Sequence, residues 1–260
     1  MTTARDDRLE RLAARFWPGP LTLVLPRHPG VPDLVTAGLD TVGVRVPDHP
    51  AARALIREAQ TPLAAPSANP FSYLSPTTAG HVADQLGARV DLILDGGACR
   101  VGVESTILSL AADPPVILRP GAVLPEEIEA ILLRPLGVAT PSARPTAPGQ
   151  LARHYATRTP LRILARADEG PGREAGPRPA GRVGLLAFRE PARAHGYAAL
   201  EVLAPDGTLS TAAANLFAAL RRLDGLGLDL IAAEPCPEEG LGRAIMDRLR
   251  RCATPTSSST

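Results

Sequence analysis

Several apolar, strand-like stretches of this chain carry a polar side chain where the pattern expects a core residue. Arg45 interrupts VGVRVP, and Arg119 ends PVILR. Ser105 and Thr106 open another apolar run, STILSL, directly after Glu104. Local conflicts of this kind gather at functional sites. Two guanidinium groups can each form paired hydrogen bonds to a phosphate or a carboxylate, so the pattern predicts a site for an anionic, phosphate-bearing ligand.

Each of these side chains also has an ordinary structural explanation. An arginine at the end of a strand, such as Arg45 or Arg119, is most often a solvated cap. A serine at the start of a helix is most often a cap as well. The functional interpretation therefore depends on the number of such positions in one part of the chain. It also depends on the nearly neutral net charge, which gives no general excess of basic surface residues to explain them.

The segment PLAAPSANPFSYLSPTTA, residues 62–79, raises the same question. Its first five residues are expected to form a short buried strand, and Ser67 and Asn69 follow that strand. Ser75 is expected to cap a helix that runs to about residue 86, with a proline at the first helical position. Free backbone N–H groups at such a helix start attract anions, and small residues such as Ala65 let a ligand approach the backbone.

The sequence shows no residue pattern typical of other kinds of catalytic chemistry. We recognise no nucleophile with a neighbouring base and no paired carboxylates, and we expect His49 and His81 to be solvated because neither has an evident partner. The chain contains no lysine, its three cysteines are far apart, and no two histidines have metal-ligand spacing on one helix. Neither a disulfide framework nor a metal site is predicted. Any catalysis would depend on positioning and electrostatics, as in phosphoryl or nucleotidyl transfer.

Composition narrows the class of protein further. The chain has 260 residues, 45% of them hydrophobic, and a formal net charge of +1. These values indicate a globular protein with enough material for a core, and without a strong field toward nucleic acid or membranes. No apolar run approaches the roughly 20 residues that span a bilayer. The charged first residues do not resemble a signal peptide, so a soluble cytoplasmic protein is predicted.

Periodicity predicts the elements that must position the candidate residues. Helices are expected over residues 5–16, 50–60, 126–133, 211–223 and 240–252, in addition to the helix after Ser75. Further strands are expected over residues 21–26, 41–47, 91–97, 105–110, 115–121, 161–164, 182–188, 199–205 and 228–234.

Composition also divides the chain into domains. A stretch rich in Pro, Ala, Thr and Arg predicts a linker over residues 136–160, and a Pro- and Gly-rich stretch predicts a surface loop over 167–181. The sequence thus predicts a mixed α/β domain over 1–135, a smaller α/β domain over 161–255, and a disordered tail.

Five motifs occur in the order and spacing of the YrdC family: FWPGPLTLVL, VGVRVPDHP, APSANPFSYLSPTTA, GVESTILSL and ILRPGAV. APGQLARHYATRTPL resembles the linker of the family's two-domain members, and DRLRRCA looks like the end of their C-terminal domain. The resemblance covers nearly the whole chain, from Phe16 to Ala253. It implies a YrdC-like twisted mixed sheet with flanking helices, followed by a small Rossmann-like α/β domain.

The resemblance also implies an activity, that of an L-threonylcarbamoyladenylate synthase. Such enzymes combine L-threonine, bicarbonate and ATP, with Mg²⁺, into threonylcarbamoyl-AMP and pyrophosphate. A separate transferase then modifies adenosine in tRNA. Affinity for RNA is expected to be weak here because the chain is nearly neutral.

The family's binding residues can be carried over motif by motif. Threonine would be held by the side chains of Arg45 and Ser105 and by the backbone of Ala65. The nucleotide would be contacted by six residues, namely Thr41, Ser67, Asn69, Ser75, Arg119 and Tyr155. In this assignment Tyr155 closes over the nucleotide from the linker, and Asn69 supports the turn.

One difference from the family leaves alternatives open. Family members carry a further front segment with a threonine-binding strand and a lysine-x-arginine motif for the phosphates. Either the sequence is a shortened form of such an enzyme, or the protein is an inactive remnant that binds nucleotide or RNA. We favour the first alternative because the other motifs are intact, and we expect the chain as written to bind ATP weakly. A relative that transfers carbamoyl groups is disfavoured because the linker and second domain match the two-domain synthases.

Overall fold

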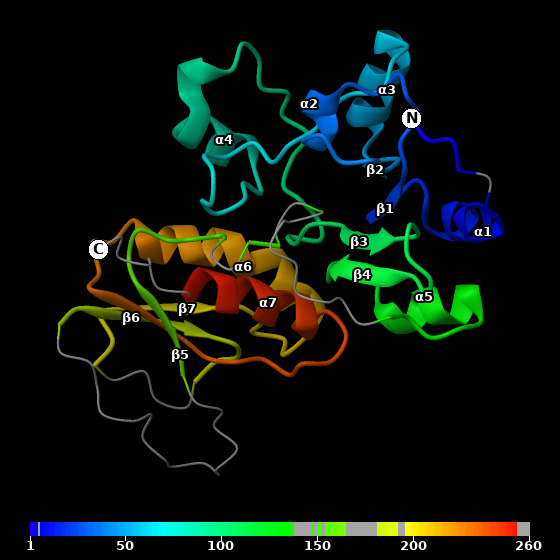
Figure 1. Cartoon of the computed structure of the whole chain (residues 1–260). Helices are drawn as coiled ribbons and strands as arrows, with labels where there is room; N and C mark the ends of the chain where they lie inside the picture. Colours follow the sequence, from blue (N-terminus) through cyan, green and yellow to red (C-terminus); the bar gives the residue numbers. More distant parts are fainter. Residues whose placement is uncertain are drawn as a thin grey trace, which may run out of the picture. The chain divides into compact units, whose positions relative to one another are not determined.

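The structure is a computed structural model that describes residues 1–4, 6–137, 147, 150–151, 154–164, 181–191 and 196–253 (Figure 1). The chain divides into two compact units. Unit 1 consists of Met1–Pro66 and Glu104–Gln150, and unit 2 of Ser67–Val103 and Leu151–Thr260. Most of the expected linker and surface loop, and the tail from residue 254, lie outside the described residues. The predicted domain boundaries therefore stay a prediction.

Unit 1 contains a four-stranded mixed sheet in the order β2-β1-β3-β4. Its strands are β1 (Leu21–Pro26), β2 (Thr41–Val44), β3 (Thr106–Ser109) and β4 (Val116–Arg119). β1 pairs with β2 and β3 with β4 in antiparallel fashion, whereas β1 and β3 are parallel. The ladder between β3 and β4 carries an irregularity next to Ile107, which pairs with Arg119. That irregularity lies where two candidate residues meet.

Two helices of unit 1 share one apolar core with its sheet. α1 (Asp7–Phe16) and α5 (Pro125–Leu132) bring Leu12 and Ile128, both fully buried, against strand residues such as Leu23. The four-residue spacing of the apolar positions puts them on one face of each helix, and burial of that face stabilises the packing. The short helix α2 (Asp33–Thr36) and α3 (Pro50–Ala59) complete the unit's helices.

Unit 2 contains a four-stranded parallel sheet in the order β5-β8-β6-β7. The strands are β5 (Leu161–Ile163), β6 (Val183–Ala187), β7 (Ala199–Val202) and β8 (Leu230–Ala233). α6 (Leu209–Asp224) and α7 (Gly242–Ala253) lie along one face of this sheet (Figure 1). Their apolar residues form one core with β6 and β8. Such an arrangement confirms the predicted α/β class.

Residues 67–103 also belong to unit 2 and include α4 (Ala79–Leu86) and a short 3-10 helix (Gly87–Arg89). Leu74 and Val103, from this segment, are buried in the same core as Phe217 of α6. The segment therefore packs with the C-terminal sheet and helices, although the sequence places it within the first predicted domain.

Three sequence predictions in this region are wrong. Residues 62–66 and 91–97 do not form strands, and their leucines, including Leu92 and Leu94, are exposed. An apolar run becomes a strand only when another strand pairs with it, and no described residue does so here. The helix after Ser75 begins three residues later than predicted, because the side chain of Thr78 caps it by accepting from the backbone N–H of His81 (3.2 Å).

None of the helices among the described residues is both long enough and apolar enough to span a membrane.

Candidate functional site

The nine candidate residues divide between the units. Unit 1 contains Thr41, Arg45, Ala65, Ser105 and Arg119, and unit 2 contains Ser67, Asn69, Ser75 and Tyr155.

Arg119 and Ser105 are two candidate residues of unit 1 that hydrogen-bond directly to each other. Arg119 ends β4 and Ser105 immediately precedes β3, so the antiparallel pairing brings them together. The Nη2 atom of Arg119 donates to the backbone oxygen of Ser105 at 2.9 Å and to its Oγ at 3.3 Å, and Nε donates to the same backbone oxygen at 3.3 Å. Both residues are buried, so Arg119 is not a solvated strand end.

The hydroxyl group of Ser105 has a second partner. It lies 2.8 Å from the hydroxyl group of Thr22, the second residue of β1. The guanidinium of Arg119 and the hydroxyl of Thr22 thus hold Ser105 Oγ at the start of the inner strand β3. Gly121, two residues after Arg119, permits this approach: a Cβ there would lie 2.4 Å from the backbone oxygen of Glu104.

The other candidates in unit 1 are more open. Arg45, directly after β2, is exposed and lines a pocket of about 450 Å³ together with Gly43 and Arg57. Ser105 and Arg119 are not among the residues that line this pocket. Thr41 begins β2 and is half-buried, while Ala65 is exposed in an irregular segment. A cavity shared by Arg45 and Arg119 stays a prediction.

The candidates Ser67, Asn69 and Ser75 lie in one segment of unit 2, residues 67–78, which we call the polar loop. The backbone oxygen of Ser67 accepts from the backbone N–H of Asn69 (2.9 Å). The side-chain amide of Asn69 donates to the backbone oxygens of Pro70 (2.9 Å) and Tyr73 (3.1 Å). Asn69 thus supports the turn, as expected. Ser75 is buried but does not cap a helix.

Tyr155 is buried in the core of unit 2. Its side chain packs against Phe217, with 5.5 Å between the ring centres, and beneath the guanidinium of Arg248, 5.3 Å from the ring centre. Only 1% of Tyr155 is exposed. The expected contact between this ring and a nucleotide stays a prediction.

The expectation that the histidines are solvated is wrong for His81, which is half-buried beside a hydroxyl partner. His49 caps α3 by accepting from the backbone N–H of Ala51 (3.2 Å). His81 is half-buried, and its Nδ1 lies 3.2 Å from both the backbone nitrogen and the hydroxyl of Thr77. Burial lowers the pKa of His81, and the positive charge of Arg221 lowers it further. Neutral His81 therefore accepts from the end of the polar loop, because a protonated Nδ1 could not accept.

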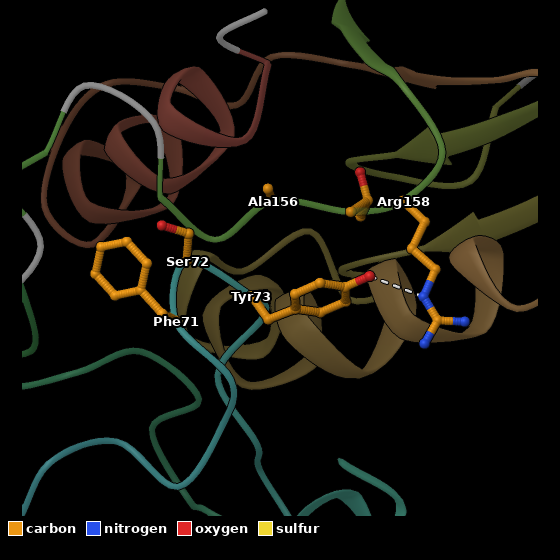
Figure 2. Close-up of a pocket in the computed structure, with 6 residues that line it drawn as sticks. Phe71, Ser72, Tyr73, Ala156 and Arg158 are labelled. Carbon is orange, nitrogen blue, oxygen red and sulfur yellow. Dashed lines mark hydrogen bonds between the residues drawn. The ribbon is translucent and has the colours of Figure 1, made fainter. Parts of the chain in front are cut away.

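Sequence reasoning also missed two arginines that contact the polar loop, Arg158 and Arg221. Arg158 donates from Nε to the hydroxyl of Tyr73 at 2.8 Å (Figure 2). Arg221 of α6 donates from Nη2 to the backbone oxygen of Leu74. One signal was present in the sequence: Arg221 lies four residues after Phe217, on the helix face expected to be apolar.

The arrangement suits binding and orientation rather than covalent catalysis. Guanidinium and hydroxyl groups dominate it, and they can hold anions and stabilise developing negative charge. Across the described ranges no group of three or more His, Cys, Asp and Glu side chains is placed to hold a metal ion.

Comparison with known proteins assigns two parts of the chain to known families. Residues 1–121 match the Sua5/YciO/YrdC family, described under the heading of telomere recombination. Residues 123–254 match the C-terminal domain of threonylcarbamoyl-AMP synthases. Together the matches define a two-domain protein of the Sua5 type.

Individual relatives agree with this class. The chain is 43% identical to the threonylcarbamoyl-AMP synthase of Bacillus subtilis, over 97% of this chain and 75% of that protein. It is 42% identical to the synthase of Pyrococcus abyssi, over 95% and 74%. The crystal structure of P. abyssi Sua5 with L-threonine superposes with a TM-score of 0.86 and covers 97% of this chain and 76% of that one, at 37% identity. The chain belongs to the threonylcarbamoyl-AMP synthase family.

Proposed function

We propose that the chain forms threonylcarbamoyl-AMP and pyrophosphate from L-threonine, bicarbonate and ATP. The observation that carries this proposal is the 43% identity to a B. subtilis threonylcarbamoyl-AMP synthase across 97% of the chain. L-threonine as the amino-acid substrate is supported by its presence in the crystal structure of P. abyssi Sua5.

The proposed reaction makes two bonds. The amine of threonine adds to the carbon of bicarbonate and water is lost, which gives a carbamate. A carbamate oxygen then attacks the α-phosphorus of ATP. The bond from that phosphorus to the α,β-bridging oxygen breaks, and pyrophosphate leaves with the electron pair. Because both nucleophiles come from the substrates, the protein needs to supply only orientation and charge stabilisation.

The candidate residues take separate parts in this proposal. Arg45, Ser105 and the backbone of Ala65 hold threonine. Thr41, Ser67, Asn69, Ser75, Arg119 and Tyr155 contact the nucleotide. The hydrogen bonds from Arg119 to Ser105 support this assignment, because a residue assigned to the nucleotide then orients one assigned to threonine.

Magnesium is the ion that we propose to accompany ATP, where it would neutralise charge on the triphosphate. The described residues include no cluster that fits a protein-held metal ion. We expect the phosphates and water to supply most ligands of the ion, as is common for Mg²⁺ bound with nucleotides.

We propose a catalytic domain over 1–135, a linker over 136–160 and a C-terminal domain over 161–255. The matched ranges 1–121 and 123–254 support two domains. The product would pass to a transferase that modifies tRNA, and this step would place the protein in the cytoplasm.

The test is pyrophosphate release by the purified chain. ATP turnover that needs both threonine and bicarbonate is expected, together with a product whose mass equals threonylcarbamoyl-AMP. The same assay with free L-alanine instead of L-threonine as the amino-acid substrate is the control. A chain that binds ATP but releases no pyrophosphate with all substrates present would instead support the inactive remnant.

A further inference from the structure

Three consecutive residues of the polar loop, Ser72, Tyr73 and Leu74, form hydrogen bonds with the rest of unit 2. The backbone oxygen of Ser72 accepts from the backbone N–H of Ala156 at 2.8 Å. The hydroxyl of Tyr73 accepts from Nε of Arg158 at 2.8 Å, and the guanidinium lies 5.8 Å from the centre of the Tyr73 ring. Figure 2 shows these side chains along a pocket of about 310 Å³. The third tie is the bond from Arg221 to the backbone oxygen of Leu74.

The contact made by Arg221 is the strongest of the three, because its side chain is partly buried and water competes less for its hydrogen bonds. Its Nη2 also donates to the side-chain oxygen of Gln85 in α4 at 3.1 Å. Its Nε is buried and has no hydrogen-bond partner among the described residues. Burial lowers the pKa of Arg221. Hydrogen bonds from a charged donor in such surroundings are stronger than those between neutral groups.

The loop needs such ties, because its conformation is not one that its sequence favours. Ser72 has φ 63°, in the left-handed region that costs free energy for residues other than glycine. Leu74 is 1% exposed and packs in the core that contains Phe217. A strained turn at Ser72 and a buried side chain at Leu74 thus flank Tyr73. Ser75, a proposed nucleotide contact, comes directly after the three tied residues.

We infer that Arg158 and Arg221 are positioning residues: from unit 2 they hold residues 72–74, and so place Ser67, Asn69 and Ser75 for the nucleotide. This inference rests on the proposed function. It gives the C-terminal sheet and helices a direct part in nucleotide binding, although the arginines themselves need not touch ATP.

The decisive variant is Arg221→Met, which keeps much of the side-chain volume and removes the donors. We expect the KM for ATP to rise about tenfold, since a charged hydrogen bond to the loop is lost. The KM for threonine is expected to stay within about twofold, because the proposed threonine residues all lie in unit 1. Loss of folded protein alone would lower kcat and leave both KM values unchanged.

Three further variants separate positioning from general effects. Arg221→Lys is expected to restore most of the ATP affinity, because a single nitrogen of Arg221, Nη2, donates both to Leu74 and to Gln85. Arg158→Met is expected to raise the KM for ATP only about threefold, since Arg158 is exposed. Arg222→Met is the matched control: Arg222 is the next residue of α6, is exposed and pairs with Glu201 (2.6 Å). It should leave both KM values unchanged.

Amide hydrogen exchange tests the inference without turnover. Exchange of the polar-loop amides should be about tenfold faster in Arg221→Met than in the wild type or Arg222→Met. Unchanged loop exchange, or an unchanged KM for ATP in an active Arg221→Met protein, overturns the inference. If the wild type itself releases no pyrophosphate, the proposed function fails, and the exchange experiment still decides whether Arg221 holds the loop.

Discussion

Replacing Arg119 with methionine tests the core of the candidate site in unit 1. The change removes three hydrogen bonds to Ser105, two of them to its backbone oxygen. Because both residues are buried, the carbonyl oxygen loses charged donors at a place that water reaches poorly. Such a loss costs about 1–3 kcal/mol of unfolding free energy. If Arg119 also stabilises charge on the phosphates, the barrier rises by about 2–4 kcal/mol, or roughly 30- to 900-fold in kcat/KM.

The assay combines pyrophosphate release with urea unfolding followed by circular dichroism. The unfolding curve gives the fraction of folded protein at the assay temperature, so a loss of rate can be separated from a loss of fold. Arg119→Met should be folded under assay conditions and still lose most of its turnover. A rate within about threefold of the wild type would refute the reasoning that its charge acts on the nucleotide.

Ser105→Ala provides the matched comparison. This variant removes the weaker 3.3 Å bond to Arg119 and the 2.8 Å contact with Thr22, but the backbone oxygen that accepts the 2.9 Å bond remains. Its unfolding free energy should fall by less than that of Arg119→Met. The KM for threonine should rise while the KM for ATP changes little, since Ser105 is assigned to threonine.

Two further predictions concern pH and close packing. Burial and the charge of Arg221 lower the pKa of His81, so the unfolded chain takes up a proton first as pH falls below about 6.5, and the free energy of unfolding should decrease there. Between pH 7 and pH 5, His81→Gln should lose less unfolding free energy than the wild type, as measured by urea unfolding. Equal losses in the two proteins would show that the bonds to Thr77 do not depend on this proton. Gly121→Ala should lower the unfolding free energy by more than about 2 kcal/mol, because its Cβ would lie 2.4 Å from the backbone oxygen of Glu104; an unchanged melting temperature would mean that the backbone there moves freely.

Much of the fold follows from local sequence pattern, because pattern reports burial. The strand expected over 21–26 is present with the same bounds, and the helix expected over 211–223 is present within a slightly longer one. The pattern gave wrong predictions where strand formation depends on pairing with another strand. Residues 62–66 and 91–97 are apolar, but no described residue pairs with them. It also failed at Ser75, because two nearby hydroxyl residues compete to cap the helix and Thr78 does so.

The candidate site was predictable to a similar extent. Ser105 and Arg119 stood out because each interrupts an apolar pattern, and the pairing of β3 with β4 does bring them into contact. The place of Arg221 on an apolar helix face was a signal, but the partners of Arg158 and Arg221 could not be predicted, since they lie 85 and 147 residues away in sequence. Contacts over such separations come from tertiary packing, which propensity and spacing do not report.

The chain passes between the two units at residues 66–67, 103–104 and 150–151. No single break in the polypeptide can therefore release either unit intact. A fragment ending near residue 121, where the first family match stops, would carry Leu74 and Val103 away from the side chains that bury them. Such a fragment of this chain would expose apolar surface and tend to aggregate, so we expect the two units to fold well only when they are expressed together.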